Sequence, residues 1–233
     1  MLLVIAALSE ELRIAQELCR SCTASVCFLR SGVGPKAAAT RLSRFLESHA
    51  VSKILAFGYA GALDPDLKVG DLVAVRLVVS IGENAPARTP LDQMEAEGCW
   101  NLSTDDLGSL GVEIHSASVL TTPFIIGNPE QKKLLRARFQ AAAVDMETGA
   151  FARVASAAGI PLAAVRAISD EAEDSFLAPV SYDPSSTMAG KLTKAVSAGH
   201  WLRRYQDWAS RAAIARASLR RFLTVYFGIA NNK

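Results

Sequence analysis

The stretch from Ala143 to Asp170, AVDMETGAFARVASAAGIPLAAVRAISD, decides the fold. A short apolar run opens it, a segment of small residues typical of a helix follows, and the apolar run Leu162–Ile168 leads into Asp170. A strand that is apolar on both faces belongs inside a mostly parallel sheet, where ligands bind beyond the carboxyl ends of the strands. Glu147 and Asp170 are therefore the first site residues to consider.

The chain on either side of this stretch alternates between two patterns. Further strands are expected at Leu2–Leu8, Val26–Arg30, Ile54–Phe57, Leu72–Val79, Ile114–Leu120 and Ala142–Val144. Helices are expected at Glu10–Cys19 after Ser9 as N-cap, Pro35–Ser48, Pro129–Phe139 after Asn128, and Thr148–Ala158, which stops at Gly159. The alternation predicts one α/β domain with a central, mostly parallel, twisted sheet flanked by helices. Ser80 to Leu110 shows no clear period and is interpreted as loops around the site.

Length and composition limit the class of protein. With 233 residues, 50% of them hydrophobic, the chain is long enough for one domain with a full core. No apolar run approaches the roughly 18 residues that a membrane span needs, and Leu2–Leu8 lacks the flanks of an export signal. The four cysteines are interpreted as packing thiols of a reducing compartment. We therefore expect a cytoplasmic protein.

The C-terminal segment differs from the rest of the chain. Six arginines lie between Trp201 and Tyr226 against the single acid Asp207, and apolar residues recur there with alternating steps of four and three. This predicts a helical, Arg-rich amphipathic extension over 184–233 that follows the domain over 1–183 in which the site residues lie. Either its apolar seam packs on its own domain or a partner subunit, or it contacts an anionic membrane or a lipid-like substrate. No motif for nucleic-acid binding accompanies the charge.

A glycine-rich turn, Gly32-Val33-Gly34, follows one predicted strand and opens a helix. It fits a loose dinucleotide fingerprint, but the next strand, Ile54–Phe57, carries no acid to hold a ribose, so dinucleotide binding is not favoured. The turn still exposes backbone N–H groups that suit a phosphate or a sugar oxygen. Three closely spaced glycines follow Phe57, at positions 58, 61 and 70. They indicate a close approach of the backbone to a ligand or to another segment.

Five motifs in order carry a family resemblance. They are Ile5-Ala6-Ala7-Leu8-Ser9-Glu10-Glu11, Ser31-Gly32-Val33-Gly34, the block from Gly58 to Asp71, Val144-Asp145-Met146-Glu147 and Val165-Arg166-Ala167-Ile168-Ser169-Asp170. Together they resemble the nucleoside phosphorylase and nucleosidase family, and the pattern is closest to the 5′-methylthioadenosine/S-adenosylhomocysteine nucleosidases. The resemblance implies an enzyme that cleaves the N-glycosidic bond of a purine nucleoside, with adenine as the base.

The resemblance also implies roles for individual residues. Asp170 would protonate the leaving base, which requires a carboxyl that carries a proton, a state that burial at a strand end favours. Glu11 would activate water, and Glu147 would accept the ribose hydroxyls. The other residues expected at the substrate are Met146, Phe124, Ser169, Val33, Gly34, Tyr59 and Asp145. Taken alone, each of the three acids could instead serve a helix N-terminus, an interpretation that is strongest for Glu11.

Departures from the family pattern leave alternatives open. Tyr59 stands where the family commonly has a small hydroxyl residue, and Asp145 stands where it commonly has Glu. A nucleoside-binding module without catalysis is therefore a second hypothesis. The first motif has no arginine-bearing phosphate loop, which favours water, although Arg30 and Arg88 leave inorganic phosphate open as a co-substrate. No metal or organic cofactor is implied.

The missing hairpin between the first helix and the Ser31 motif, together with the basic tail, is similar to the hopanoid-associated branch of the family. That branch acts on an adenosine with a large triterpenoid at the 5′ position, so a lipid-linked nucleoside is the leading specialisation. The resemblance also implies a homodimer, and the tail suggests peripheral contact with the inner face of a membrane. Deletion from Trp201 onward is predicted to spare the turnover of small 5′-thioadenosines.

Overall fold

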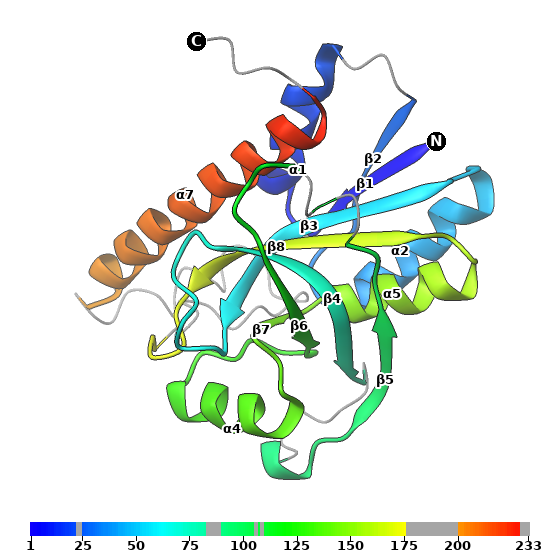
Figure 1. The fold of residues 1–233 in the computed structure, drawn as a ribbon. Helices are drawn as coiled ribbons and strands as arrows, with labels where there is room; N and C mark the ends of the chain where they lie inside the picture. Colours follow the sequence, from blue (N-terminus) through cyan, green and yellow to red (C-terminus); the bar gives the residue numbers. More distant parts are fainter. Residues whose placement is uncertain (22–24, 83–89, 105–106, 108–109, 176–199, 229–233) are drawn as a thin grey trace, which may run out of the picture.

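The structure is a computed structural model that describes residues 1–21, 25–82, 90–104, 107, 110–175 and 200–228, without the side chains of 92 and 200–208. A central eight-stranded sheet organises it (Figure 1). The strands are β1 (Leu2–Ala6), β2 (Val26–Arg30), β3 (Lys53–Ala62), β4 (Leu72–Ile81), β5 (Ala96–Asn101), β6 (His115–Thr121), β7 (Ala143–Asp145) and β8 (Leu162–Asp170).

The sheet is mostly parallel, which confirms the predicted fold class. The strands β2, β1, β3 and β8 pair in parallel, as do β4, β6 and β7. Antiparallel pairs join β3 to β7, β4 to β8 and β4 to β5. The strands β3, β8, β4, β6 and β7 thus pair in a closed circuit, and β1 and β2 extend the sheet from β3.

Helices cover both faces of the sheet, as Figure 1 shows. They are α1 (Ser9–Leu18), α2 (Pro35–Ser48), α4 (Pro129–Phe139), α5 (Thr148–Ala157) and α7 (His200–Tyr226), with short 3-10 turns at Cys19–Ser21 and Leu91–Gln93. Because side chains alternate along a strand, Leu3 and Ile5 pack with α2 and α5, whereas Val4 and Ala6 pack with α1 and α7. One core layer therefore lies on each face, and a third cluster of buried residues includes Leu135 of α4.

Local chemistry sets the helix ends. Asn128 caps α4 as predicted, because its side chain accepts a hydrogen bond from Glu130 N, and Gly159 follows α5 with a φ of +65°. Ser9 is not the N-cap of α1, contrary to the prediction. The N-cap is Leu8, and the Glu11 carboxylate accepts its backbone N–H at 2.8 Å. The first turn of α1 is therefore tied down by a candidate site residue.

The C-terminal helix α7 docks on its own chain along the described part of its seam. Ala215, Leu219 and Phe222 are fully buried, in one cluster with residues of α1, β3 and β8. Ion pairs join Arg211 to Asp174, and two further arginines to α1, namely Arg216 to Glu10 and Arg220 to Glu17. This packing argues against the expectation that deletion from Trp201 spares turnover, because the deletion would expose part of the core.

Two further expectations are wrong. The segment Ser80–Leu110 is not all loop: β4 runs on to Ile81, and β5 pairs with it as an edge strand whose residues are mostly exposed. An exposed edge strand lacks the apolar alternation that marks strands in a sequence. Cys19 is also disulfide-bonded rather than a packing thiol, whereas Cys27 and Cys99 are free. Within the described residues, none of the helices has the length and apolarity needed to cross a membrane.

Candidate active site

A cavity of about 220 Å³ lies at the carboxyl ends of the strands. Residues that follow β1, β6 and β7 meet there with the last residues of β3 and β8, and Ala212 of α7 closes one side. Every expected site residue except Gly34 lines this cavity. These residues are Glu11, Val33, Tyr59, Phe124, Asp145, Met146, Glu147, Ser169 and Asp170. The edge of the sheet predicted from Ala143–Asp170 therefore holds the cavity.

Glu11 is almost fully buried at this cavity. Its two carboxylate oxygens accept the backbone N–H groups of Leu8, at 2.8 Å, and of Tyr59, at 3.1 Å. Burial raises the pKa of Glu11 to about 7, against the lowering effects of the Leu8 N–H and of the Arg166 charge. A carboxyl that titrates near neutral pH can exchange a proton with a bound water molecule.

Glu147 is held by the glycine-rich turn. The backbone N–H of Gly34 donates to Glu147 Oε1 at 2.8 Å, so this turn serves a carboxylate of the same chain. Gly34 has a φ of +89°, a conformation that glycine adopts without strain. Burial raises the pKa of Glu147 to about 8, the Arg166 charge lowers it, and Asp145 raises it further. Its side chain does not cap α5, although that use was open from the sequence.

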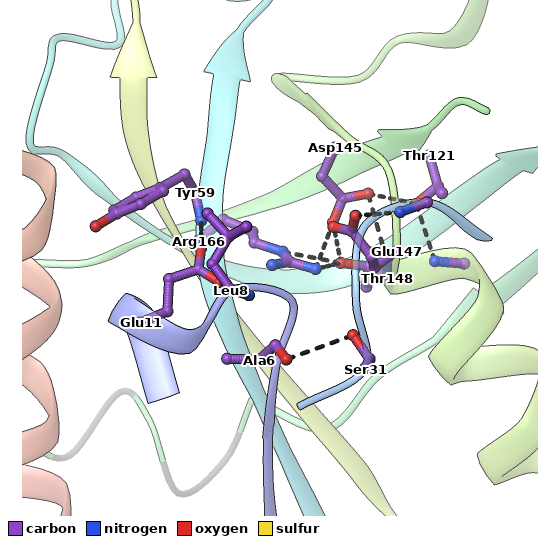
Figure 2. Close-up of polar contacts among 12 residues, drawn as sticks. Ala6, Leu8, Glu11, Ser31, Tyr59, Thr121, Asp145, Glu147, Thr148 and Arg166 are labelled. Atoms are coloured by element: carbon purple, nitrogen blue, oxygen red, sulfur yellow. Dashed lines mark hydrogen bonds and ion pairs between the residues drawn. The ribbon is translucent and has the colours of Figure 1, made fainter. Parts of the chain in front are cut away.

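A buried arginine joins these acids. Arg166 of β8 donates to Thr148 Oγ1 from Nε at 3.0 Å and from Nη2 at 2.7 Å, and Nη2 lies 2.7 Å from Asp145 Oδ2. Figure 2 shows its guanidinium extending from the side of Glu11 and Tyr59 toward Asp145 and Glu147. Asp145 also accepts from Thr121 Oγ1 at 2.6 Å and from the hydroxyl of Thr148. Its oxygens are thus engaged by protein donors.

Asp170 is the last residue of β8 and also lines the cavity. Ser169 donates to Asp170 Oδ1 at 2.8 Å, and Lys132 of α4 donates to Oδ2 at 2.5 Å. The Lys132 side chain is 0% exposed, and that of Asp170 is 10% exposed. The sequence predicted a carboxyl that burial alone keeps protonated, but the structure gives this carboxyl a buried cation as partner. Asp170 caps no helix, since Asp174 accepts the N–H of Glu171.

Two glycines allow the charged groups to approach the sheet. A Cβ on Gly58 would lie 2.5 Å from Arg166 Nη1 and 2.9 Å from Glu11 Oε1. A Cβ on Gly61 would lie 2.8 Å from Asp170 Oδ2. Real Cβ atoms do not come this close to other atoms, which confirms the expected close approach at this block.

Sequence reasoning missed two cations. Arg166 had a signal, because it is the one charge in the apolar run Leu162–Ile168 and a buried arginine needs carboxylate partners. No sequence signal marked Lys132, because it precedes Lys133 in a stretch that is typical of a solvated helix face. Within the described residues, no group of three or more His, Cys, Asp or Glu side chains could hold a metal ion.

Comparison with known proteins places this geometry in a family. The model of the phosphorylase superfamily matches residues 20–197. The chain therefore belongs to the phosphorylase superfamily. Among its relatives is a 5′-methylthioadenosine/S-adenosylhomocysteine nucleosidase of Shewanella denitrificans, 30% identical over 178 residues that make up 71% of this chain and 76% of the relative. An aminodeoxyfutalosine nucleosidase of Helicobacter pylori is 29% identical over 53% of this chain and 58% of the relative.

Solved structures share the fold. Futalosine hydrolase of Helicobacter pylori superposes with a TM-score of 0.71 over 97% of this chain and 96% of that chain, at 18% identity. A 5′-methylthioadenosine/S-adenosylhomocysteine nucleosidase of Neisseria meningitidis, in complex with methylthio-immucillin-A, superposes with a TM-score of 0.69 at 17% identity, over 97% of each chain. The fold expected from the family resemblance is thereby confirmed.

Proposed function

We propose that this protein is a purine nucleosidase that hydrolyses the N-glycosidic bond of an adenine nucleoside, with a modified 5′ position. The observation that carries the proposal is that the carboxyls of Glu11, Glu147 and Asp170 line one cavity. Glycosidic cleavage passes through an oxocarbenium-like state, so it needs a proton donor for the leaving group and a group that activates the nucleophile. The names of the nucleosidase relatives support the same reaction.

Each carboxyl suits one task. Asp170 would protonate N7 of the base, and Glu11, whose pKa of about 7 lies near the working pH, would take the proton of the attacking water. Glu147 would accept the ribose hydroxyls, since the N–H of Gly34 fixes only one of its oxygens. Asp145 would hold Arg166 rather than contact substrate, because protein donors already engage its oxygens.

Water is favoured over phosphate as the nucleophile. Among the described residues, none of those that line the cavity is a lysine or arginine. A phosphate dianion would therefore meet acids without a cation at the cavity wall. Of the two arginines considered for an anion site, Arg30 donates to Ser9 and to no cavity residue that the structure describes, and Arg88 lies outside the described residues.

The 5′ substituent would extend toward α7. Ala212 of this helix lines the cavity together with Tyr59. An adenosine with a large lipid group of the hopanoid type remains the leading specialisation. Contact with a membrane and a homodimeric state remain predictions. The seam residues Ala215, Leu219 and Phe222 are not free for lipid, because they are buried in the protein.

Adenine release tests the proposal. The wild-type protein is incubated with methylthioadenosine, adenosine and a 5′-long-alkyl adenosine, each with and without phosphate, and base loss is followed by ultraviolet absorbance. We expect release that does not need phosphate, and fastest turnover for a 5′-modified substrate. Strict dependence on phosphate would instead make the protein a phosphorylase.

The alternative of a nucleoside-binding module makes a different prediction for Asp170→Asn. A catalyst loses turnover by about two to four orders of magnitude when a positioned acid is removed, while a binder loses only modest affinity. We expect the larger loss in kcat, with nucleoside affinity retained in calorimetric titration. Absence of turnover by the wild type on all three substrates would favour the binding module.

A further inference from the structure

Lys132 is a buried lysine that has no role in the proposed reaction as described above. Its side chain is 0% exposed and does not line the cavity. It lies in the first turn of α4, where the helix dipole disfavours a cation, whereas Arg136 and Arg138 occupy the favourable last turn. A lysine is costly to bury, and a cation is unfavourable in the first turn of a helix. Residues that depart from such preferences concentrate at functional sites.

The contacts of Lys132 point to Asp170. Its Nζ donates to Asp170 Oδ2 at 2.5 Å and to the backbone carbonyl of Glu171 at 2.6 Å. The Ser169 hydroxyl lies 2.8 Å from Oδ1 of the same carboxylate and 3.2 Å from Ala60 O. It has a single proton to donate, and the shorter contact is the one to Asp170. Both oxygens of Asp170 thus accept a hydrogen bond from a protein donor, and the residue lines the cavity.

We infer that Lys132 is the positioning residue that holds Asp170 and supplies the proton that Asp170 passes to the leaving base. This inference rests on the proposed nucleosidase function. Because Nζ of Lys132 donates its hydrogen bond to an oxygen of Asp170, a proton can pass along this contact as Asp170 gives one to the base. The interaction also anchors α4 to the end of β8, because the second acceptor is the carbonyl next to Asp170.

The C1′–N9 bond breaks and its electron pair goes to the base. A proton passes from the ammonium of Lys132 to the carboxylate of Asp170 and from there to N7, which leaves Asp170 ionised and Lys132 a neutral amine. Water gives its hydroxyl to C1′ and its proton to Glu11. Exchange with solvent then returns one proton to Lys132 and removes one from Glu11.

The test is a double-mutant cycle on the full-length protein. The variants are Lys132→Met, Asp170→Asn and the pair, and Lys133→Met serves as the matched control, because Lys133 is the exposed neighbour of Lys132 on α4. Adenine release from the best substrate of the wild type is the readout, with kcat and KM measured separately. Thermal unfolding of each variant checks that it is folded.

We expect Lys132→Met to lower kcat by about a hundredfold or more, the effect of losing a positioned acid, with little change in KM. The double variant should be no slower than Asp170→Asn alone, because Lys132 acts only through Asp170. Turnover of Lys132→Met equal to that of Lys133→Met would overturn the inference, as would losses that simply add in the double variant.

Two provisions keep the result decisive. A buried carboxylate without its partner is destabilising, so if Lys132→Met does not fold, Lys132→Gln replaces it, since the amide keeps a hydrogen-bond donor and removes the charge. Lack of base release by the wild type would refute the proposed function itself. Base release by the wild type with an unaffected Lys132 variant would refute only the role of Lys132.

Discussion

Among single residues, a glycine without a side chain is as important to the site as the charged residues. Gly61 has no side chain, and Asp170 Oδ2 lies only 2.8 Å from the point where a Cβ would be, closer than real Cβ atoms come to other atoms. The same oxygen bonds to Lys132, so it cannot move without weakening that hydrogen bond. The position of the proposed acid is therefore set from three sides, by Gly61, Ser169 and Lys132.

Gly61→Ala should displace the Asp170 carboxylate and lower kcat by about tenfold to a hundredfold, because small misplacements at a reacting centre are costly. The control is Gly111→Ala, whose new Cβ would meet no atom within 4 Å but whose φ of +67° strains alanine. The control should lose stability and keep its turnover per folded molecule. Steady-state kinetics together with thermal unfolding separate the two effects. Equal turnover of both variants would show that Asp170 tolerates displacement.

At the scale of elements, α7 should contribute to stability through its buried face and much less through its charges. Phe222 is fully buried in the core, so Phe222→Ala should lower the free energy of unfolding by about 3–5 kcal/mol. Arg220→Ala removes an exposed pair with Glu17 and should cost no more than about 1 kcal/mol. Urea unfolding measures both. A larger loss for Arg220→Ala would mean that the charges dominate.

The sequence predicted most elements because their patterns are local. The run Leu162–Ile168 is apolar on both faces, and only a central strand needs that. The prediction failed at β5, because this edge strand is mostly exposed and its sequence does not alternate between apolar and polar residues. It also failed at Lys132, because the partner Asp170 lies 38 positions away and pairing at that separation leaves no local trace. The carboxyls of the cavity were predictable from motifs, but their protein partners were not.

At the scale of the whole molecule, the raised pKa values of Glu11, about 7, and Glu147, about 8, set a pH dependence of stability. The native state keeps protons that the unfolded chain releases near the ordinary value of 4.5. Because the native state binds more protons between these values, the free energy of unfolding should fall as pH rises from about 4.5 to about 8.

Urea unfolding from about pH 5 to about pH 8 measures this slope. Glu147→Gln removes one of the two groups and should make the slope shallower. The matched control is Glu130→Gln on the first turn of α4. Its carboxyl is exposed and has no hydrogen bond or ion pair with a side chain among the described residues, so the slope should stay unchanged. A slope that Glu147→Gln does not alter would show that this carboxyl is not buried in its neutral form.

The closed circuit of β3, β8, β4, β6 and β7 has a consequence for the time course of folding. The walls of the cavity come from segments as far apart in sequence as Leu8 and Ala212, and parallel pairs such as β3 with β8 form only after long loops have closed. No early, locally folded fragment can contain the cavity. During refolding, helical content should therefore return first, and catalytic activity should return only with the slowest phase, when the last strand completes the circuit.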